Sequence, residues 1–368
     1  MATMSKHSHY YVLDFLRGIA ALSVVLFHFL ARIDTSGLMG HGYLAVDFFF
    51  MLSGYVIENA YSVRVQSGEM NLRKFMLTRA IRLMPMVIVG TFLAAAFDFF
   101  RPGLGDFSSH AIEVLICLFL GILLLPVFWS TSLESASFPL NGPIWSLFFE
   151  TIGNVIHAMT FNYRHRLVAY FVTAVVSLAL FFWATYYYGG SFDFGPHKTG
   201  FLVGFPRLLW SYMVGVIICM LRMQLTAISK WIYAAVLVSI YLVPKDYCFP
   251  YLDILTICLV NPLIIMSASG DRSFYEARSI TRLLGELSYP VYALHYPFIR
   301  VVGVLIRTHK FSLPYNILLA TAGTLLIAVL AYMVYVKIDV PIRSYLQRRV
   351  FRSRNLQHQD GAEAIQRS

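Results

Sequence analysis

Ionisable side chains occur at helical spacing inside the first apolar stretch of the chain, "LDFLRGIAALSVVLFHF" at residues 13–29. Arg17 and His28 are eleven positions apart. On a helix they would share one face, about 20° apart, and be separated by roughly 16 Å along the axis. Asp14 lies one turn before Arg17 and can pair with it. Ionisable groups inside a membrane are candidates for function; an ion pair and a core histidine that only pack the helix are the alternative.

The second apolar segment, "GYLAVDFFFMLSGYVI", carries a carboxylate near the depth expected for His28. We expect Asp47 to orient or charge-stabilise that imidazole. Ser53 and Gly54 favour the close approach of a neighbouring helix. His41, just before the segment, is interpreted as a surface histidine.

Two arginines stand three positions apart in the stretch "NLRKFMLTRAIRLMP". Arg79 and Arg82 share one helical face at the expected cytoplasmic boundary. Guanidinium groups match phosphate oxygens in geometry and charge, which favours a phosphorylated cosubstrate. A helix that rests on anionic lipid is the alternative.

A polar stripe follows in "NGPIWSLFFETIGNVIH". Glu150, Asn154 and His157 fall at i, i+4 and i+7, and Ser146 precedes the glutamate by one turn. A carboxylate inside the membrane needs water or a partner, so Glu150 is a candidate catalytic group and Asn154 and Ser146 are candidate substrate contacts. Trp145 is either an interface anchor or a wall of an acceptor pocket.

The late stretch "LGELSYPVYALHYPFIR" holds a second histidine among tyrosines. Tyr292 and His295 are three positions apart and are candidate substrate-binding residues; a hydrogen-bonded core histidine is the alternative. Pro290 and Pro297 are expected to loosen the helix. Glu286, near the inner end, is interpreted as structural.

The composition places these residues in a polytopic membrane protein. Of the 368 residues, 58% are hydrophobic and 13% are charged, which is outside the range of soluble domains. The net charge of +10 is typical of cytoplasmic loops rich in Lys and Arg, and no nucleic-acid partner is expected. The four cysteines form no CxxC pair, so no disulfide or metal site is expected: Cys117, Cys219, Cys248 and Cys258.

Eleven apolar segments are long enough to be considered as membrane spans. They lie near residues 10–30, 43–61, 84–100, 111–129, 143–161, 167–188, 203–221, 231–247, 250–268, 283–306 and 314–337. The predicted fold is therefore an all-α helical bundle. The first segment has no convincing cleavage site and is expected to be retained.

The positions of the basic residues suggest the topology. With the basic connections and both termini in the cytoplasm, the loop at 130–142, which has no Lys or Arg, lies outside. An even number of crossings is then needed between residues 82 and 164. We therefore expect about ten spans plus one re-entrant or interfacial segment, either 84–100 or 111–129. Residues 1–342 form the membrane domain, and 343–368 are expected to be a disordered cytoplasmic tail.

Taken together, these motifs resemble the membrane-bound acyltransferase family 3 over about residues 10–342. The resemblance rests on five stretches in the same order: Arg17 with His28, "VDFFFMLSG", Arg79 with Arg82, "IWSLFFE" with Glu150, and "LSYPVYALHYP" with His295. Asn154 departs from the family, in which an aromatic residue commonly follows the glutamate at this position.

The resemblance implies a function for the chain. Members of the family acylate extracytoplasmic sugars, so an acyl group, most plausibly acetyl, would move from acyl-CoA to a saccharide hydroxyl without a metal. It implies essential roles for Arg17 and His28 and a location in the bacterial inner membrane. Arg79, Arg82 and Arg17 would hold the CoA phosphates, and His28 would act as general base or acyl carrier, assisted by Glu150 and Asp47.

Two non-enzymatic alternatives also place charges in a helical bundle. A transporter or flippase would carry inverted repeats and a midplane site on broken helices, and we find no such repeat in the sequence. A relay protein would only carry acyl groups across the membrane to a separate transferase.

Overall fold

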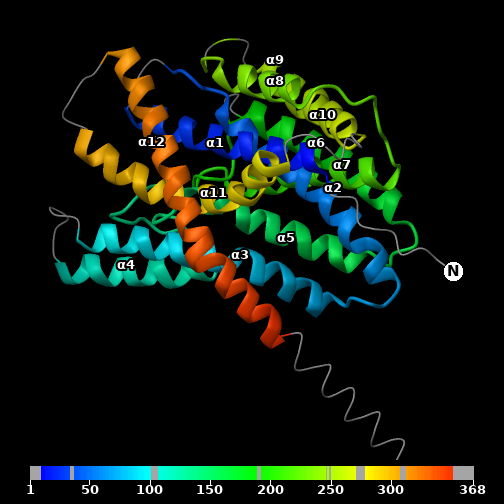
Figure 1. Ribbon diagram of the computed structural model, residues 1–368, viewed down its shortest axis with the longest axis horizontal. Coiled ribbons are helices and arrows are strands. Elements are labelled where there is room, and N and C mark those ends of the chain that lie inside the picture. The colour runs from blue at the N-terminus through cyan, green and yellow to red at the C-terminus, as the bar shows by residue number, and fades with distance from the viewer. Residues whose placement is uncertain are drawn as a thin grey trace, which may run out of the picture.

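The computed structural model describes residues 10–33, 37–100, 107–188, 192–245, 247, 250–270, 278–306 and 312–350. Within these ranges the chain is mostly helical, and the only β-pairing is an isolated bridge between Ala136 and His197. The predicted all-α fold is confirmed. Figure 1 shows the helices gathered into one bundle.

The helices follow one another along the chain as predicted from the apolar segments. In order they are α1 (Tyr11–Ile33), α2 (Ala45–Gln66), α3 (Leu72–Phe99), α4 (Phe107–Ile122), α5 (Trp145–Thr160), α6 (Arg166–Tyr187), α7 (Gly204–Met220), α8 (Lys230–Leu242), α9 (Tyr251–Leu255), α10 (Asn261–Ala268), α11 (Arg278–Ile306) and α12 (Leu313–Val334). Short 3₁₀ turns precede α2, α5 and α7, at Gly42–Leu44, Gly142–Ile144 and Phe201–Val203. Single π-turns join α9 to α10 and extend α12, at Thr256–Val260 and Tyr335–Asp339.

Six helical stretches within the described residues are long and apolar enough to cross a membrane. They are Tyr11–Ile33, Leu72–Phe99, Arg166–Tyr187, Phe201–Met220, Tyr251–Ala268 and Leu313–Val350. The chain is therefore an integral membrane protein, whereas the predicted number of about ten crossings stays a prediction. The last stretch also shows that the helix continues to Val350, beyond the boundary predicted at residue 342. The rest of the predicted tail lies outside the described residues.

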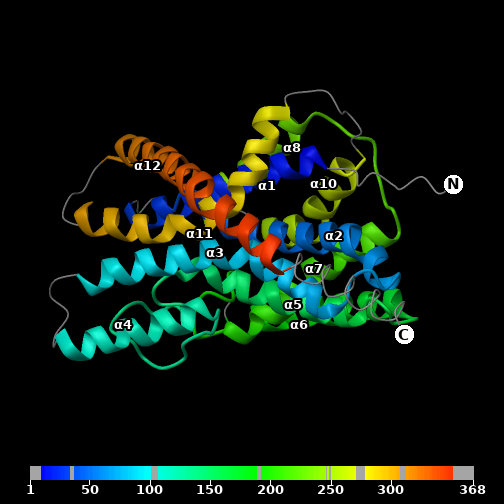
Figure 2. The same cartoon turned by 60° about the horizontal axis from the view of Figure 1, so that its bottom comes forward.

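Which of the segments 84–100 and 111–129 is re-entrant or interfacial stays a prediction, but the two helices that contain them differ in length. Helix α3 runs for 28 residues, whereas α4 has only 16, a length of about 24 Å against a hydrocarbon thickness of about 30 Å. Figure 2 shows α4 lying along the end of α3. After α4 the chain is largely non-helical as far as Asn141.

Helices α1 and α11 form the central pair of the bundle and run parallel. Asp14 lies against Gly285 near the start of both helices, and Arg32 lies against Gly303 near their ends. A Cβ atom at Gly18 would come within 2.5 Å of the Leu284 side chain, so this glycine permits the close contact. The parallel packing places Arg17, His28 and Arg32 of α1 in contact with polar groups of α11.

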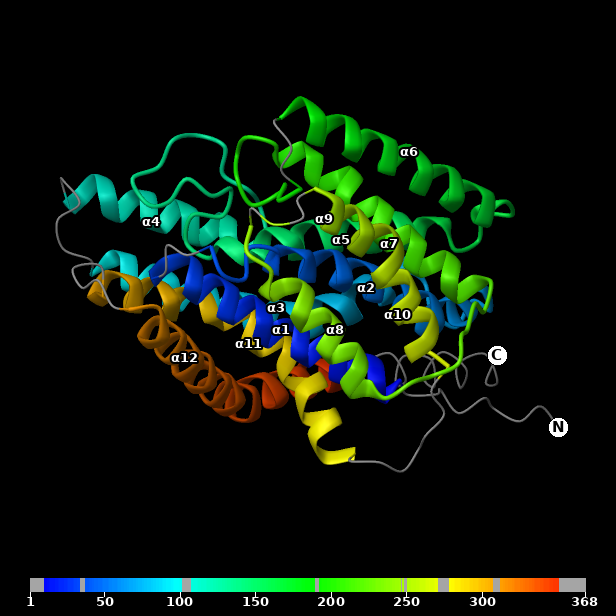
Figure 3. The same ribbon diagram turned by 90° about the horizontal axis from the view of Figure 1, so that it is seen from above.

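Helix α2 crosses α7 equally closely. A Cβ atom at Gly54 would lie 2.0 Å from the carbonyl oxygen of Tyr212, and one at Gly215 would lie 1.9 Å from that of Met51. The expectation that Gly54 lets a neighbour approach is therefore confirmed. Figure 3 shows α7 between α2 and α6, with α6 and α12 on opposite sides of the bundle.

Helix α11 stays helical through both of its prolines. Pro297 has no N–H to donate to the carbonyl of Ala293, four residues earlier. That carbonyl instead accepts a hydrogen bond of 2.9 Å from the side chain of Asn141. The proline thus frees an acceptor that ties the segment after α4 to the central helix pair.

The prediction that His41 is a surface histidine is wrong. Its side chain is fully buried, and its Nδ1 lies 2.6 Å from Asp253 at the start of α9. Tyr43 donates a hydrogen bond to the same carboxylate. His41 lies between apolar segments, and its partner Asp253 is far away in the sequence. Local composition therefore does not reveal this polar contact.

Replacing Gly215 by Ala should destabilise the bundle. The new methyl group would overlap the Met51 carbonyl, and overpacking of this kind costs about 1–3 kcal/mol. Gly153→Ala is the matched control, because a Cβ atom on that helical glycine would meet only ordinary contacts at 3.4 Å. We expect a lower thermal midpoint in detergent for Gly215→Ala only. Equal midpoints for the two variants would contradict the close crossing of α2 and α7.

Candidate active site

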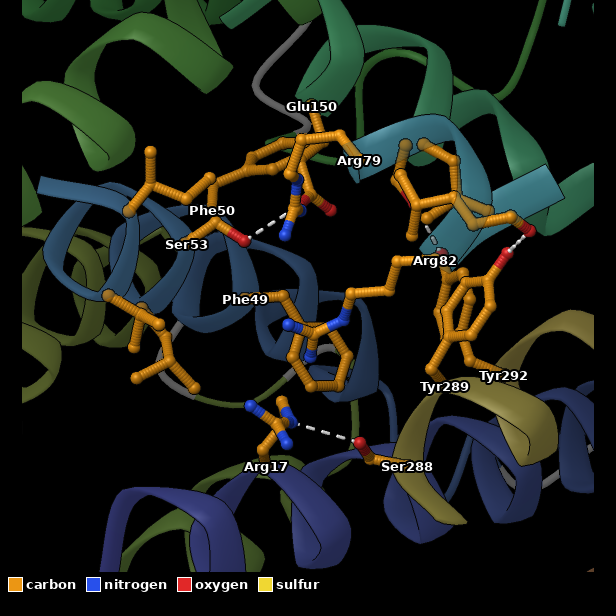
Figure 4. A pocket seen from close by; sticks show the side chains of 16 residues that line it. Arg17, Phe49, Phe50, Ser53, Arg79, Arg82, Glu150, Ser288, Tyr289 and Tyr292 are labelled. Atoms are coloured by element: carbon orange, nitrogen blue, oxygen red, sulfur yellow. Dashed lines mark hydrogen bonds and ion pairs between the residues drawn. The ribbon is translucent and has the colours of Figure 1, made fainter. Parts of the chain in front are cut away.

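A cavity of about 90 Å³ opens between α1, α2, α3, α5 and α11. Its walls mix apolar side chains with arginines from two helices and a glutamate from a third. The polar lining residues, shown in Figure 4, are Arg17, Ser53, Arg79, Arg82, Ser146, Glu150, Ser288, Tyr289 and Tyr292. Six of the residues singled out in the sequence thus meet at one place: Arg17, Arg79, Arg82, Ser146, Glu150 and Tyr292.

Glu150 is held by two groups on neighbouring helices. Arg79 donates to its carboxylate at 2.8 Å, and the hydroxyl of Ser53 donates to the same oxygen, also at 2.8 Å. Arg79 is buried, with 6% of its surface exposed, which does not fit the alternative in which this arginine rests on anionic lipid. The pair neutralises both charges at the cavity wall and fixes the rotamer of each side chain.

Arg17 is held at the opposite wall by α11. It forms the predicted ion pair with Asp14 at 2.7 Å and donates to the Ser288 hydroxyl at 3.0 Å and the Gly285 carbonyl at 2.8 Å. These three partners fix the orientation of the guanidinium group, and Arg17 lines the cavity.

Arg82 differs from the other two arginines of the cavity. It makes no hydrogen bond or ion pair with any residue in the described ranges, and its side chain is exposed. Figure 4 shows it extending into the space between Arg79 and Arg17. Since its guanidinium group has no hydrogen-bonding partner among the described residues, Arg82 is the cation of the cavity best placed to bind an anion that enters it.

The two histidines lie together rather than in the cavity wall. Nδ1 of His28 is 3.0 Å from Nε2 of His295, and the two rings are 5.0 Å apart. His295 is fully buried, whereas His28 is partly exposed. The sequence placed both residues near the site but did not predict that they are bonded to one another.

Tyr292 connects the cavity to the histidine pair. It lines the cavity, and its ring lies 5.7 Å from that of His295. Its hydroxyl is 2.7 Å from the Ser146 hydroxyl and donates to the Pro143 carbonyl at 2.9 Å. A group that passes from the cavity to the histidines would meet this ring.

A network of charges on the far side of the histidines was not predicted from the sequence. Glu134 accepts from Arg32 and, at 2.5 Å, from the Tyr296 hydroxyl, and lies 3.3 Å from Nε of Arg300. Arg300 in turn holds the buried Asp98 through two bonds of 2.6 and 2.7 Å. Glu134 is the only charged residue of the sequence between 130 and 142, and this was the signal available.

Asp47 does not make the contact that the sequence suggested. Its carboxylate is held by Arg207, whose Nε and terminal nitrogen lie 3.0 and 2.8 Å away, and both side chains are fully buried. Trp145 packs against the same guanidinium group at 5.5 Å and does not line the cavity. The expected pairing of Asp47 with the His28 imidazole is therefore wrong, since an arginine 160 positions along the chain is the stronger partner for a buried carboxylate.

The C-terminal residues of the polar stripe on α5, Asn154 and His157, do not line the cavity either. Asn154 accepts from the Tyr212 hydroxyl at 3.0 Å, and that hydroxyl lies 3.1 Å from Nδ1 of His157. His157 contacts Glu58 at 2.9 Å, and Arg166 pairs with the same carboxylate. Asn154, predicted to bind substrate, does not line the cavity and instead joins α5 to α7.

Comparison with known proteins identifies the family. A family model described as "Acyltransferase domain" matches residues 10–333. "Protein 2 in picA locus" of Rhizobium radiobacter is 34% identical over 167 residues, which cover 42% of this chain and 84% of that protein. "Peptidoglycan O-acetyltransferase OatA" of Listeria monocytogenes is 32% identical over 106 residues, 28% of this chain and 16% of that longer protein. No solved structure matches the chain.

The match covers every helix that lines the cavity, and the arginines, the glutamate and the two histidines all lie within it. The membrane helices and the polar cavity are therefore parts of the same matched domain. The resemblance seen in the sequence is confirmed, and the chain belongs to this family of acyltransferases.

Proposed function

We propose that the protein transfers an acyl group, most simply acetyl, from cytoplasmic acyl-CoA to a hydroxyl group of an extracytoplasmic or lipid-linked saccharide. The observation that carries this proposal is a cationic cavity that Tyr292 separates from the His28–His295 pair; in it Arg82 forms no hydrogen bond with any described residue. The name of the Listeria relative supports a glycan acceptor and an acetyl group.

The charges of the cavity fit the donor. Coenzyme A carries phosphate groups, and its thioester is at the end of a long, narrow arm. Arg82 and Arg17 would bind phosphate oxygens at the mouth, and the Arg79–Glu150 pair would line the path of the arm. The arm would have to displace Tyr292 from Ser146 to bring the thioester to the histidines, so a small acyl group fits this route better than a long one.

The orientation follows from the basic residues of the sequence. If the ends at which α1 and α11 begin face the cytoplasm, Arg17 lies toward the cytoplasmic side. His28, Arg32 and Glu134 then lie toward the opposite side, where a saccharide would arrive. Donor and acceptor would approach the histidine pair from opposite sides of the membrane.

The reaction needs a base for the hydroxyl group of the acceptor. A positioned histidine typically contributes about 10²–10⁴-fold to such a step. His28 is partly exposed, so a hydroxyl could reach it. The proton would pass to the imidazole as the oxygen attacks the thioester carbonyl, and then to the sulfur of the departing CoA.

Replacing His28 by Ala should lower acyl transfer by at least about 100-fold without reducing the amount of folded protein in the membrane. We would measure label transferred from [¹⁴C]acetyl-CoA to isolated peptidoglycan and soluble oligosaccharides by the purified protein. His165→Ala is the matched control, since that histidine is exposed and outside the cavity. Transfer at the wild-type rate by His28→Ala would refute the assignment. If the wild type never consumed the thioester, a transporter would be favoured.

Replacing Arg82 by Gln should raise the KM for acetyl-CoA by about 10- to 100-fold, because one charge-assisted hydrogen bond contributes about 1.5–3 kcal/mol. Arg73→Gln, on the exposed start of the same helix, should leave it unchanged. With S-acetyl-N-acetylcysteamine, a donor without phosphates, Arg82→Gln and the wild type should react equally. A KM defect of the same size with both donors would show that Arg82 does not bind phosphate.

A further inference from the structure

We propose that His295 is a positioning residue that fixes the tautomer of His28, so that Nε2 of His28 is the nitrogen that takes the proton of the acceptor. The inference rests on the proposed function for the identity of that acceptor. The hydrogen-bond geometry of the pair can be tested without any acceptor.

The tautomer of His295 is set by the backbone of its own helix. Its Nδ1 lies 2.7 Å from the carbonyl oxygen of Tyr292 and 3.2 Å from that of Val291. Carbonyl oxygens only accept hydrogen bonds, so Nδ1 must carry the hydrogen. A neutral imidazole has one N–H, which leaves a lone pair on Nε2 of His295.

The lone pair on His295 then acts on the tautomer of His28, together with the backbone carbonyl of Val24, which is a second hydrogen-bond partner of that ring. Nε2 of His295 is 3.0 Å from Nδ1 of His28. Because the first nitrogen is an acceptor, the second must donate. The hydrogen of the neutral His28 ring is therefore on Nδ1, and the lone pair of that ring is on Nε2. The carbonyls of α11 thus orient a base on α1 through one intervening imidazole.

Burial and exposure fit this division of roles. His295 has no exposed surface, and the ring edge that it presents to the backbone cannot reach a substrate. His28 is partly exposed. Its ring lies edge-on to that of Tyr296 at 5.7 Å, and the Tyr296 hydroxyl is bound to Glu134 on the side away from the cavity. We expect the acceptor hydroxyl group to approach His28 from that side.

The proton movement is balanced without further reactants. The hydroxyl proton goes to Nε2 of His28 as the oxygen forms a bond to the thioester carbonyl. The carbon–sulfur bond then breaks, and the same proton passes from Nε2 to the sulfur, which gives an ester and a free thiol. Throughout these steps the Nδ1 hydrogen of His28 stays bonded to His295, which stabilises the transient imidazolium.

The first test is a spectrum of the intact protein. Solid-state ¹⁵N NMR of protein labelled in its 11 histidine rings distinguishes nitrogens with and without a hydrogen. The signals lost in His28→Ala belong to residue 28. We expect a protonated Nδ1 and an unprotonated Nε2 in the wild type. The opposite tautomer of His28, or an imidazolium at His295 near neutral pH, would overturn the proposal even if the protein proved to be an active transferase.

Two variants of His295 then separate positioning from packing. His295→Gln can still present an acceptor to His28, whereas His295→Leu fills a similar space without one. We expect His295→Leu to lose the fixed tautomer of His28 and to lower kcat by about tenfold or more while the KM for acetyl-CoA changes less than about twofold. His295→Gln should keep the tautomer and most of kcat.

The remaining outcomes are also decisive. A His295→Leu protein with the wild-type tautomer and kcat would show that the second histidine only packs. If His295→Leu does not fold, the wild-type spectrum and His295→Gln decide the question, and a Gln variant with the other tautomer and full activity would contradict the proposal. A wild type with the predicted tautomer but no acyl transfer to any acceptor would refute the proposed function alone.

Discussion

The need to pair every charge inside an apolar bundle determines how these helices are arranged. An unpaired buried charge costs several kcal/mol, and breaking one buried pair costs about 3–5 kcal/mol. Three of the buried pairs join helices that are distant in sequence. Asp47 joins α2 to α7 through Arg207, Asp98 joins α3 to α11 through Arg300, and Glu150 joins α5 to α3. Arg82 differs from these groups, because it forms no ion pair with any residue that the structure describes.

The same constraint explains which predictions from the sequence succeeded. Helical periodicity and apolar length located the helices, and the spacing of Arg17 and Asp14 predicted their ion pair because both lie on one helix. Partners on different helices could not be predicted, since pairing depends on which helices pack together. From the sequence, Asp47 was paired with His28, which lies at a similar expected depth. In the structure its partner is the buried Arg207.

The expected depth of a residue along its helix predicted its position in the bundle better than its distance from other residues in the sequence did. The eleven-residue spacing of Arg17 and His28 placed a cation and an imidazole on one face at different depths, and the structure keeps them apart. Arg17 lines the cavity, whereas His28 lies beyond Tyr292 and contacts His295. The position of His295 on α11 could have been matched to His28 only with the parallel packing of α1 and α11, for which the sequence offered no signal.

The separation of the cavity from the histidines bears on the choice between an enzyme and a transporter. A transporter that alternates its access needs one site which each side reaches in turn. Here the ionic groups on the two sides of the histidines differ: a free arginine lies in the cavity, and Glu134, bound by two arginines and a tyrosine, lies beyond the pair. Such asymmetry suits two different ligands that meet at the histidines better than one ligand that passes between them.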